Sequence, residues 1–134
     1  MNELEIVKQY YKYFNELNWE GMLSLVSDDI RHEPNEGEAR IGTEPFKAFL
    51  NKMDTAYQET LTNQVFFTSE DDTSRIATEF TVNGIYKISE PGLPEAKGQK
   101  YVLPAGAFLE VKNGKIARIT TYYNLDLWIR LVSE

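Results

Sequence analysis

The sequence predicts an α+β fold in which three helices cover a cone-shaped, strongly curved antiparallel sheet with a mixed edge. In the first 26 residues, apolar side chains recur every three or four positions, as on the buried face of a helix. A similar stripe follows at residues 43–57, and from residue 60 onwards stretches rich in β-branched and aromatic residues alternate with turn residues. A chain of 134 residues that is 42% hydrophobic is expected to form a single domain, residues 1–134, with one core.

Four helices are expected, of which the first three cover the sheet. The first spans residues 3–17 and the second, which is shorter, spans residues 19–26. The third begins at Thr43 and carries Pro45 in its first turn, where the missing N–H of proline costs little. The last helix, residues 125–132, is short and follows the sheet.

The strands are expected in two groups. Residues 30–35 begin as a strand, turn, and return at residues 39–42 as a short hairpin partner. The main sheet comes from four segments, residues 60–67, 75–88, 99–111 and 115–123, with an Asn-Gly hairpin turn between the last two. Residues 89–98 are rich in proline and glycine, and we expect them to form a loop that caps a pocket at one end of the sheet.

The composition excludes several classes of function. The 14 basic and 21 acidic residues give a net charge of −7, which disfavours binding to nucleic acid or to an anionic membrane. The chain has no cysteine and one histidine, so thiolate and multi-histidine metal sites are excluded, and neither a metal nor an organic cofactor is expected. The sequence begins without a signal-peptide pattern and contains no run of about 18 apolar residues. A cytoplasmic protein is therefore expected.

Residues 30–35, Ile-Arg-His-Glu-Pro-Asn, are the main candidate for a catalytic site. Glu33 precedes Pro34, which favours an extended and constrained backbone at the glutamate. In an apolar pocket the pKa of this carboxyl group would rise, and the carboxylate could remove a proton beside a carbonyl. His32 is the alternative proton-transfer residue, because a regular strand directs neighbouring side chains to opposite faces unless a bulge intervenes. Asn35 could orient a carbonyl, although asparagine is also a common turn residue.

The order of elements and several short segments resemble the nuclear transport factor 2-like superfamily over nearly the whole chain. These segments are Trp19-Glu20-Gly21, Asp28-Asp29, Ile41-Gly42-Thr43 and Asn113-Gly114-Lys115-Ile116. Within that superfamily, residues 92–94, 98–99, 101–108 and 120–125 resemble the SnoaL-like, ketosteroid-isomerase-related proteins of bacteria. The superfamily includes ketosteroid isomerases, polyketide cyclases, epoxide hydrolases and scytalone dehydratases. The resemblance implies a pocket inside the cone and a homodimer.

The resemblance also implies roles for individual residues. Tyr10 matches the isomerase tyrosine that donates a hydrogen bond to an enolate oxygen, and Glu33 matches the aspartate base that precedes a proline. Gly106 occupies the position of the second oxyanion donor, an aspartic acid, and Asn124 is the nearest counterpart of the late aspartate of SnoaL-type cyclases. Two carboxyl groups of the relatives are thus absent, which weakens the case for steroid isomerisation, because oxyanion stabilisation is usually a large contribution.

The lining of the pocket follows from the strand period of two. Phe80, Val82 and Tyr86 are expected to face inward, which places Arg75 and Glu79 on the opposite face. The rest of the predicted ligand-binding set is Tyr57, Pro104, Gly106, Phe108, Ile119, Thr121, Tyr123 and Asn124. Such an aromatic and apolar pocket suits a flat hydrophobic ligand. The alternative is that these side chains only fill a core.

These observations favour a small cavity enzyme of the isomerase or cyclase type that transfers a proton on a hydrophobic, steroid- or polyketide-like carbonyl compound. Glu33 or His32 would move the proton, and Tyr10 with Asn35 would polarise the carbonyl. The first alternative is a non-catalytic domain of the same fold that binds a hydrophobic small molecule. The second is an assembly module that dimerises through the outer face of its sheet.

Overall fold

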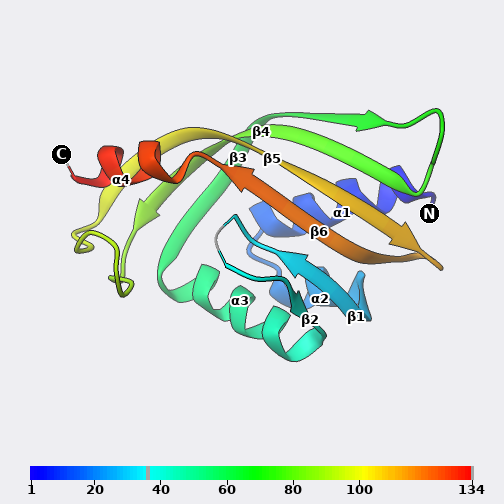
Figure 1. The fold of residues 1–134 in the computed structure, drawn as a ribbon, viewed down its shortest axis with the longest axis horizontal. Coiled ribbons are helices and arrows are strands. Elements are labelled where there is room, and N and C mark those ends of the chain that lie inside the picture. The colour runs from blue at the N-terminus through cyan, green and yellow to red at the C-terminus, as the bar shows by residue number, and fades with distance from the viewer. Residues whose placement is uncertain (36, 134) are drawn as a thin grey trace.

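The computed structural model describes every residue except 36 and 134, and it has the predicted α+β architecture. The helices are α1 (Glu3–Asn15), α2 (Trp19–Ser24), α3 (Thr43–Thr55) and α4 (Leu125–Ser133). The strands are β1 (Val26–Glu33), β2 (Arg40–Ile41), β3 (Tyr57–Thr68), β4 (Arg75–Tyr86), β5 (Gln99–Lys112) and β6 (Lys115–Tyr123). Helices α1, α2 and α3 gather on one face of a strongly bent sheet, and α4 extends from its far end (Figure 1).

The six strands form one sheet in the order β2-β1-β6-β5-β4-β3. All neighbouring pairs are antiparallel except β1 and β6, which run parallel, so the expected mixed edge is confirmed. Helix α3 packs against β1 near one edge of the sheet and against β3 at the other edge. The helix therefore bridges the open side of the bent sheet, whose inner face it covers together with α1 (Figure 1).

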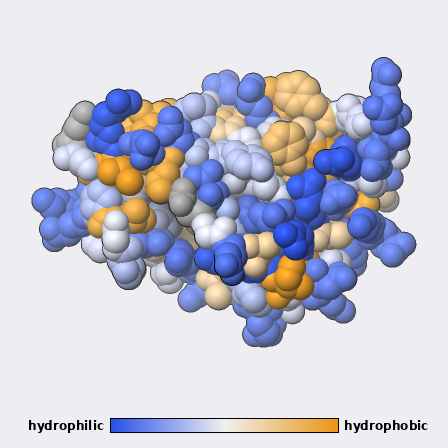
Figure 2. Space-filling model, viewed as in Figure 1, coloured by the Kyte–Doolittle hydropathy of each residue, from blue (hydrophilic) through white to orange (hydrophobic). Residues whose placement is uncertain are grey.

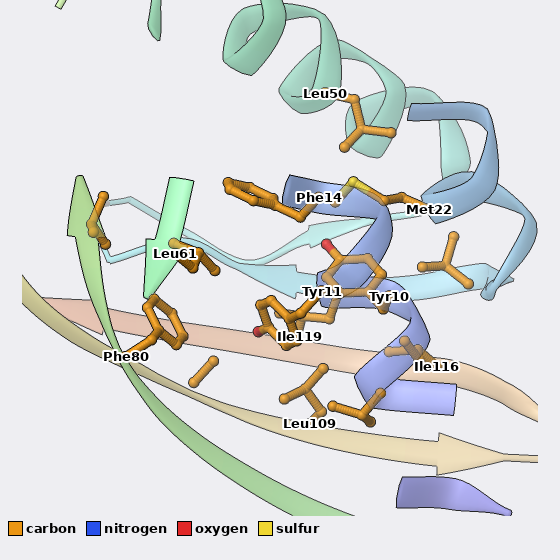
Figure 3. Packing of buried hydrophobic residues seen from close by; sticks show 14 of the residues in the cluster. Tyr10, Tyr11, Phe14, Met22, Leu50, Leu61, Phe80, Leu109, Ile116 and Ile119 are labelled. Atoms are coloured by element: carbon orange, nitrogen blue, oxygen red, sulfur yellow. The ribbon is translucent and has the colours of Figure 1, made fainter. Parts of the chain in front are cut away.

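The inner face of the sheet carries the hydrophobic core. Alternate residues of β4 are buried from Ile76 to Tyr86, as the period of a half-buried strand requires. They meet the buried face of α1, where Tyr10, Tyr11 and Phe14 lie, as Figure 3 shows. The core continues through Met22 of α2 and Leu50 of α3. This packing fixes which strand positions face inward. On the face of the molecule seen in Figure 2, hydrophilic side chains cover most of the surface and hydrophobic ones are exposed in a few patches.

The predicted registration of β5 was wrong. Pro104, Gly106 and Phe108 were expected to face inward, but Phe108 is 48% exposed and all three lie on the outer face. The pairing of Val82 with Leu103 and of Phe80 with Ala105 places the odd-numbered residues of β5 on the inner face. Residues 101–109 are apolar or small at almost every position. The sequence of β5 therefore does not show which of these residues face the core.

Strand β1 begins earlier than predicted. Val26 was assigned to the second helix, which was expected to end near residues 27–29, but the chain is already extended at Val26. The amide of Ile116 donates to the carbonyl of Leu25 over 2.8 Å, and Val26 pairs with Ile116. Pairing with the last strand therefore decides the conformation here, and no local pattern could have predicted it.

Candidate active site

Glu33 lies at the end of β1 on the outer face of the sheet, away from the core. Thr120 donates a hydrogen bond to its carboxylate over 2.7 Å and Arg31 donates another over 3.4 Å, while an Arg118 nitrogen lies 4.0 Å away. The hydrogen bond from Thr120, followed by the contributions of Arg31 and Arg118, lowers the pKa of Glu33. The expected inward orientation and raised pKa are therefore both wrong, because β1 directs His32 inward instead.

His32 faces inward from β1 and is only 3% exposed. Its ring lies 4.3 Å from that of Phe49 and 5.4 Å from that of Phe46, both on α3. Burial, together with the positive charge of Arg40, lowers the pKa of the imidazole to about 4. The Nδ1 atom has no hydrogen-bond partner among the described residues. His32 is therefore a neutral and incompletely paired group at neutral pH.

The other predicted catalytic residues hold structural positions. Tyr10 is buried in the core with its ring edge-on to Tyr11 at 5.1 Å, and burial raises the pKa of its hydroxyl. The side chain of Asn35 accepts a hydrogen bond from the Tyr123 amide over 3.0 Å. Asn124 accepts one from the amide of Leu127 over 3.0 Å, as an N-cap of α4 does. Neither asparagine side chain meets His32 or Tyr10 in these bonds.

A second carboxyl group, Glu59, lies on the inner face of β3 beside Gly84 of β4. Tyr101 pairs with Gly84 from the other side, and its ring lies so close to this glycine that a Cβ atom would clash with the ring. The Tyr101 hydroxyl crosses β4 in this way and donates a hydrogen bond to the carboxylate of Glu59. Burial raises the pKa of Glu59, and the hydrogen bond from Tyr101 opposes that rise.

Three further aromatic rings surround this Glu59–Tyr101 pair. Trp128 of α4 lies 5.9 Å from the ring of Tyr101 and 4.9 Å from that of Tyr86. Tyr57 and Tyr86 stack at 5.7 Å with an interplanar angle of 17°. The carboxyl group of Glu59 therefore lies beside an aromatic cluster at the end of the inner face near α4, and two of the predicted ligand-binding residues, Tyr57 and Tyr86, belong to that cluster.

The loop of residues 87–98 closes this end of the fold. The hydroxyl of Tyr57 donates to Glu90 over 2.7 Å, and the hydroxyl of Tyr86 donates to the carbonyl of Pro94 over 2.7 Å. Lys52 of α3 adds an ion pair to Glu90 at 3.5 Å. Two tyrosines of the aromatic cluster thus hold the loop that covers it.

Two hollows on the surface of the described residues contain none of the predicted catalytic residues. One, of about 220 Å³, lies between α2 and α3 and is lined by Trp19, Leu23 and Leu50. The other, of about 300 Å³, lies on the outer face beside Phe67 and Phe108. Among the predicted lining residues, Phe80, Val82 and Ile119 are buried in the core, Thr121 is half-buried, and Tyr123 is 36% exposed.

No group of three or more potential metal ligands occurs among the described residues. In the same part of the chain, no helix is long and apolar enough to cross a membrane.

The sequence contained a signal for Glu59 that was missed. Tyr57, Glu59 and Leu61 alternate along the inner face of β3, so the glutamate is an acidic residue at an apolar period-two position. The predicted strand began at residue 60 and Tyr57 was assigned to the third helix. Glu59 therefore fell outside the predicted strand, and its alternation with Tyr57 and Leu61 was not recognised. Tyr101 could not be recognised without knowing that it lies opposite a glycine.

Comparisons with known proteins agree with this architecture. A family model described as a SnoaL-like domain matches residues 7–119. A protein from Pseudomonas putida is 46% identical, covers 98% of each chain and superposes with a TM-score of 0.95. A protein from Silicibacter sp. is 44% identical, covers 99% of this chain and 96% of its own, and has a TM-score of 0.95. Both are described as a "putative polyketide cyclase".

A more distant structure shows how widely the fold is shared. An NTF2-like protein of unknown function from Burkholderia pseudomallei is 16% identical, covers 100% of this chain and 99% of its own, and has a TM-score of 0.73. No protein of curated function matches the sequence significantly.

Proposed function

The chain belongs to the SnoaL-like domain family, and we propose that it is a cyclase- or isomerase-type enzyme acting on a hydrophobic carbonyl compound. We place the reaction at the Glu59–Tyr101 pair and take the substrate to be steroid- or polyketide-like. The observation that carries this proposal is the carboxyl group of Glu59, which lies on the inner face beside four aromatic rings and accepts a hydrogen bond from Tyr101.

The chemistry requires a base and a hydrogen-bond donor on the same side of a carbonyl. The carboxylate of Glu59 takes a proton from the carbon next to the carbonyl, and the electron pair of that C–H bond forms an enolate. Once Glu59 carries the proton it no longer needs the hydrogen bond from Tyr101, so the single O–H of Tyr101 is free to donate to the enolate oxygen, where negative charge develops. Return of the proton to another carbon isomerises the compound. Attack of the enolate carbon on a second carbonyl closes a ring instead, and the alkoxide formed from that carbonyl takes the proton back from Glu59.

The environment of Glu59 suits a base. Burial raises its pKa from the ordinary value of 4.5, which increases the basicity of the carboxylate. A catalytic group works best when its pKa lies near the working pH. The loop of residues 87–98 would admit the substrate when its hydrogen bonds to the hydroxyl groups of Tyr57 and Tyr86 open.

Proton exchange tests this function. The protein is incubated in deuterated buffer with a β,γ-unsaturated ketosteroid or an enolisable polycyclic ketone, and deuterium incorporation is followed by mass spectrometry. We expect Glu59→Gln to slow exchange by at least about a hundredfold, as loss of a general base does. Glu33→Gln is the matched control, because it removes a carboxylate of the same sheet on the outer face, and it should leave exchange unchanged. Exchange lost in Glu33→Gln and kept in Glu59→Gln would contradict the proposal.

One observation favours a non-catalytic binding domain as the second candidate. Gly106 and Asn124 stand where the resemblance places carboxyl groups in enzymes of the superfamily, so two acid–base groups of those enzymes are missing here. A domain of this kind would bind the same ketones through its aromatic cluster and leave their protons in place. Binding seen by calorimetry without deuterium incorporation would select this second function.

We also propose that two copies of the chain pair through the outer face of the sheet. That face exposes Val65, Phe67, Val102, Phe108 and Tyr122 by 48 to 60% each. A monomer seldom exposes so many large apolar side chains together. Light scattering of the eluted protein should give twice the mass of one chain for the wild type and one chain for Tyr122→Glu. Leu17→Glu, at an exposed position on another surface, should remain a dimer, and a wild-type monomer would refute the pairing.

A further inference from the structure

Trp128 of α4 is a buried residue beside the Glu59–Tyr101 pair that the proposed reaction does not use. It is 5% exposed, and its ring meets that of Tyr101 edge-on at 5.9 Å with an interplanar angle of 79°. The same ring lies edge-on to Tyr86 at 4.9 Å and to Tyr57 at 6.3 Å. A phenylalanine could pack against the same three rings, so the indole N–H is the feature that needs an explanation.

The indole N–H of Trp128 acts on the hydroxyl of Tyr101. Burial, followed by the nearby charge of Glu59, raises the pKa of this hydroxyl, and a hydrogen bond from the Trp128 side chain opposes that rise. An indole can only donate, whereas a tyrosine hydroxyl has one hydrogen and two lone pairs. Tyr101 gives its hydrogen to Glu59, so its oxygen accepts from Trp128. The direction of both bonds is therefore fixed, from Trp128 to Tyr101 and from Tyr101 to Glu59.

Helix α4 is anchored at both ends beside the strand that carries Tyr101. At its start, the side chain of Asn124 accepts a hydrogen bond from a helix amide. At its end, the side-chain amide of Gln99 donates to the carbonyl of Val132 over 2.9 Å. Between these points the helix packs against β5, on which both Gln99 and Tyr101 lie. The indole is thus carried by a rigid element fixed to the strand of its partner, as precise orientation of a reacting group requires.

We propose that Trp128 is a positioning residue for Tyr101, and that its indole N–H holds and polarises the hydroxyl that the reaction uses as a donor. This inference rests on the proposed function for the role of Tyr101, but the two hydrogen bonds are present without a substrate. Hydrogen bonds in a chain strengthen one another. The bond from Trp128 therefore makes Tyr101 a stronger donor, first to Glu59 and then to the enolate oxygen.

A carbon NMR titration of the Glu59 carboxyl group in the protein without ligand tests the inference. Trp128 is replaced by benzothienylalanine, whose ring has sulfur in place of the N–H, in a Trp19→Phe background that leaves no other tryptophan. Burial raises the pKa of Glu59 and the bond from Tyr101 lowers it, so a weaker bond should let this pKa rise by about 0.3. Glu33 is the internal control. An unchanged Glu59 pKa, or equal changes at both glutamates, overturns the inference.

Deuterium exchange of the same ketone gives a second measurement. We expect Trp128→Phe to slow exchange about tenfold at saturating ketone, since one hydrogen bond to the donor is lost. In a Tyr101→Phe background the same change should have no further effect, because Trp128 acts through Tyr101. Equal losses in both backgrounds would mean that Trp128 only supports the fold, and would overturn the inference.

The two measurements separate this inference from the proposed function. A raised Glu59 pKa in a protein that exchanges no deuterium would keep the chain of hydrogen bonds and refute the enzymatic function. Exchange that depends on Glu59 but is the same with and without the indole N–H would keep the function and refute the role of Trp128.

Discussion

The inner and outer faces of the sheet each hold a glutamate, and the two residues have opposite properties. Glu33, on the outer face, accepts hydrogen bonds from Thr120 and Arg31, and its pKa is lowered. Glu59, on the inner face, lies beside aromatic rings, and burial raises its pKa. The surroundings on the outer face therefore stabilise the charged form of a glutamate. Burial on the inner face destabilises the charged form, which makes the carboxylate a stronger base. The direction of the pKa shift of these two glutamates therefore follows the face of the sheet on which each lies and not the neighbouring sequence.

Among changes that test the difference between Glu33 and Glu59, we expect the largest effect from adding a side chain at Gly84. In Gly84→Ala the new Cβ atom meets the ring of Tyr101, which must move and release Glu59. We expect a loss of about 2–3 kcal/mol in the free energy of unfolding, measured in urea, from overpacking. Deuterium exchange should fall at least tenfold. Adding Tyr101→Ala removes the clash, so the double variant should be more stable than the sum of the single changes predicts.

Lowering the pH should reduce the free energy of unfolding, because the buried imidazole of His32 binds a proton less readily than it does in the unfolded chain. Its pKa is about 4 in the folded protein against 6.5 in the unfolded chain, so the unfolded chain binds more protons between these values. The stability that this difference contributes is complete above pH 6.5 and is lost as the pH falls to about 4, by roughly 2–3 kcal/mol. In His32→Phe this part of the pH dependence should disappear from urea titrations. A variant with the same slope as the wild type would show that the imidazole is not desolvated.

The contributions of Glu33 and Glu59 to the free energy of unfolding should change with pH in opposite directions. The lowered pKa of Glu33 means that it stabilises the fold above the ordinary value of 4.5, and this contribution is lost as the pH falls through the folded pKa. The raised pKa of Glu59 means that its contribution is complete below 4.5 and is lost as the pH rises through the folded pKa. Urea titrations should therefore show Glu33→Gln to be less stable than the wild type at neutral pH, by no more than about 1 kcal/mol.

The same titrations should show Glu59→Gln gaining stability relative to the wild type as the pH rises from 4.5, because the variant has no carboxylate to desolvate. Slopes of the same sign for both variants would remove the contrast between the two faces.

The smallest effect is expected at the loop that covers the aromatic cluster. Tyr57→Phe removes the hydrogen bond to Glu90 and keeps the stacked ring, so it should cost about 1 kcal/mol or less. Amide hydrogen exchange at residues 88–98 should become a few-fold faster, while the rest of the sheet keeps its protection. Tyr122→Phe removes a hydroxyl on the outer face and serves as the control. Equal acceleration in both variants would mean that the loop is not held from the inner face.

The sequence was sufficient for the order and type of most elements but not for the site. Helix periodicity and the Asn-Gly turn predicted α1, α3 and the β5–β6 hairpin, because these patterns are local. The face of each strand was predictable where apolar and polar residues alternate, as in β4, and failed in β5, where Pro104 and Phe108 are as apolar as Leu103. The Glu59–Tyr101 pair joins residues 42 positions apart across a glycine, so it depends on the register of three strands.

The parallel pair of β1 and β6 has a consequence for how the chain is made. Residues near position 26 find their strand partners only near position 116, and the Lys115 side chain reaches the Ser24 carbonyl over 2.6 Å. During synthesis, the residues near position 26 therefore have no strand partner until almost the whole chain has left the ribosome, and the apolar side chains around them stay exposed until then. Pairing between segments so distant is slow to form and exposes the nascent chain to aggregation. We expect truncation before β6 to give an insoluble product rather than a smaller folded one.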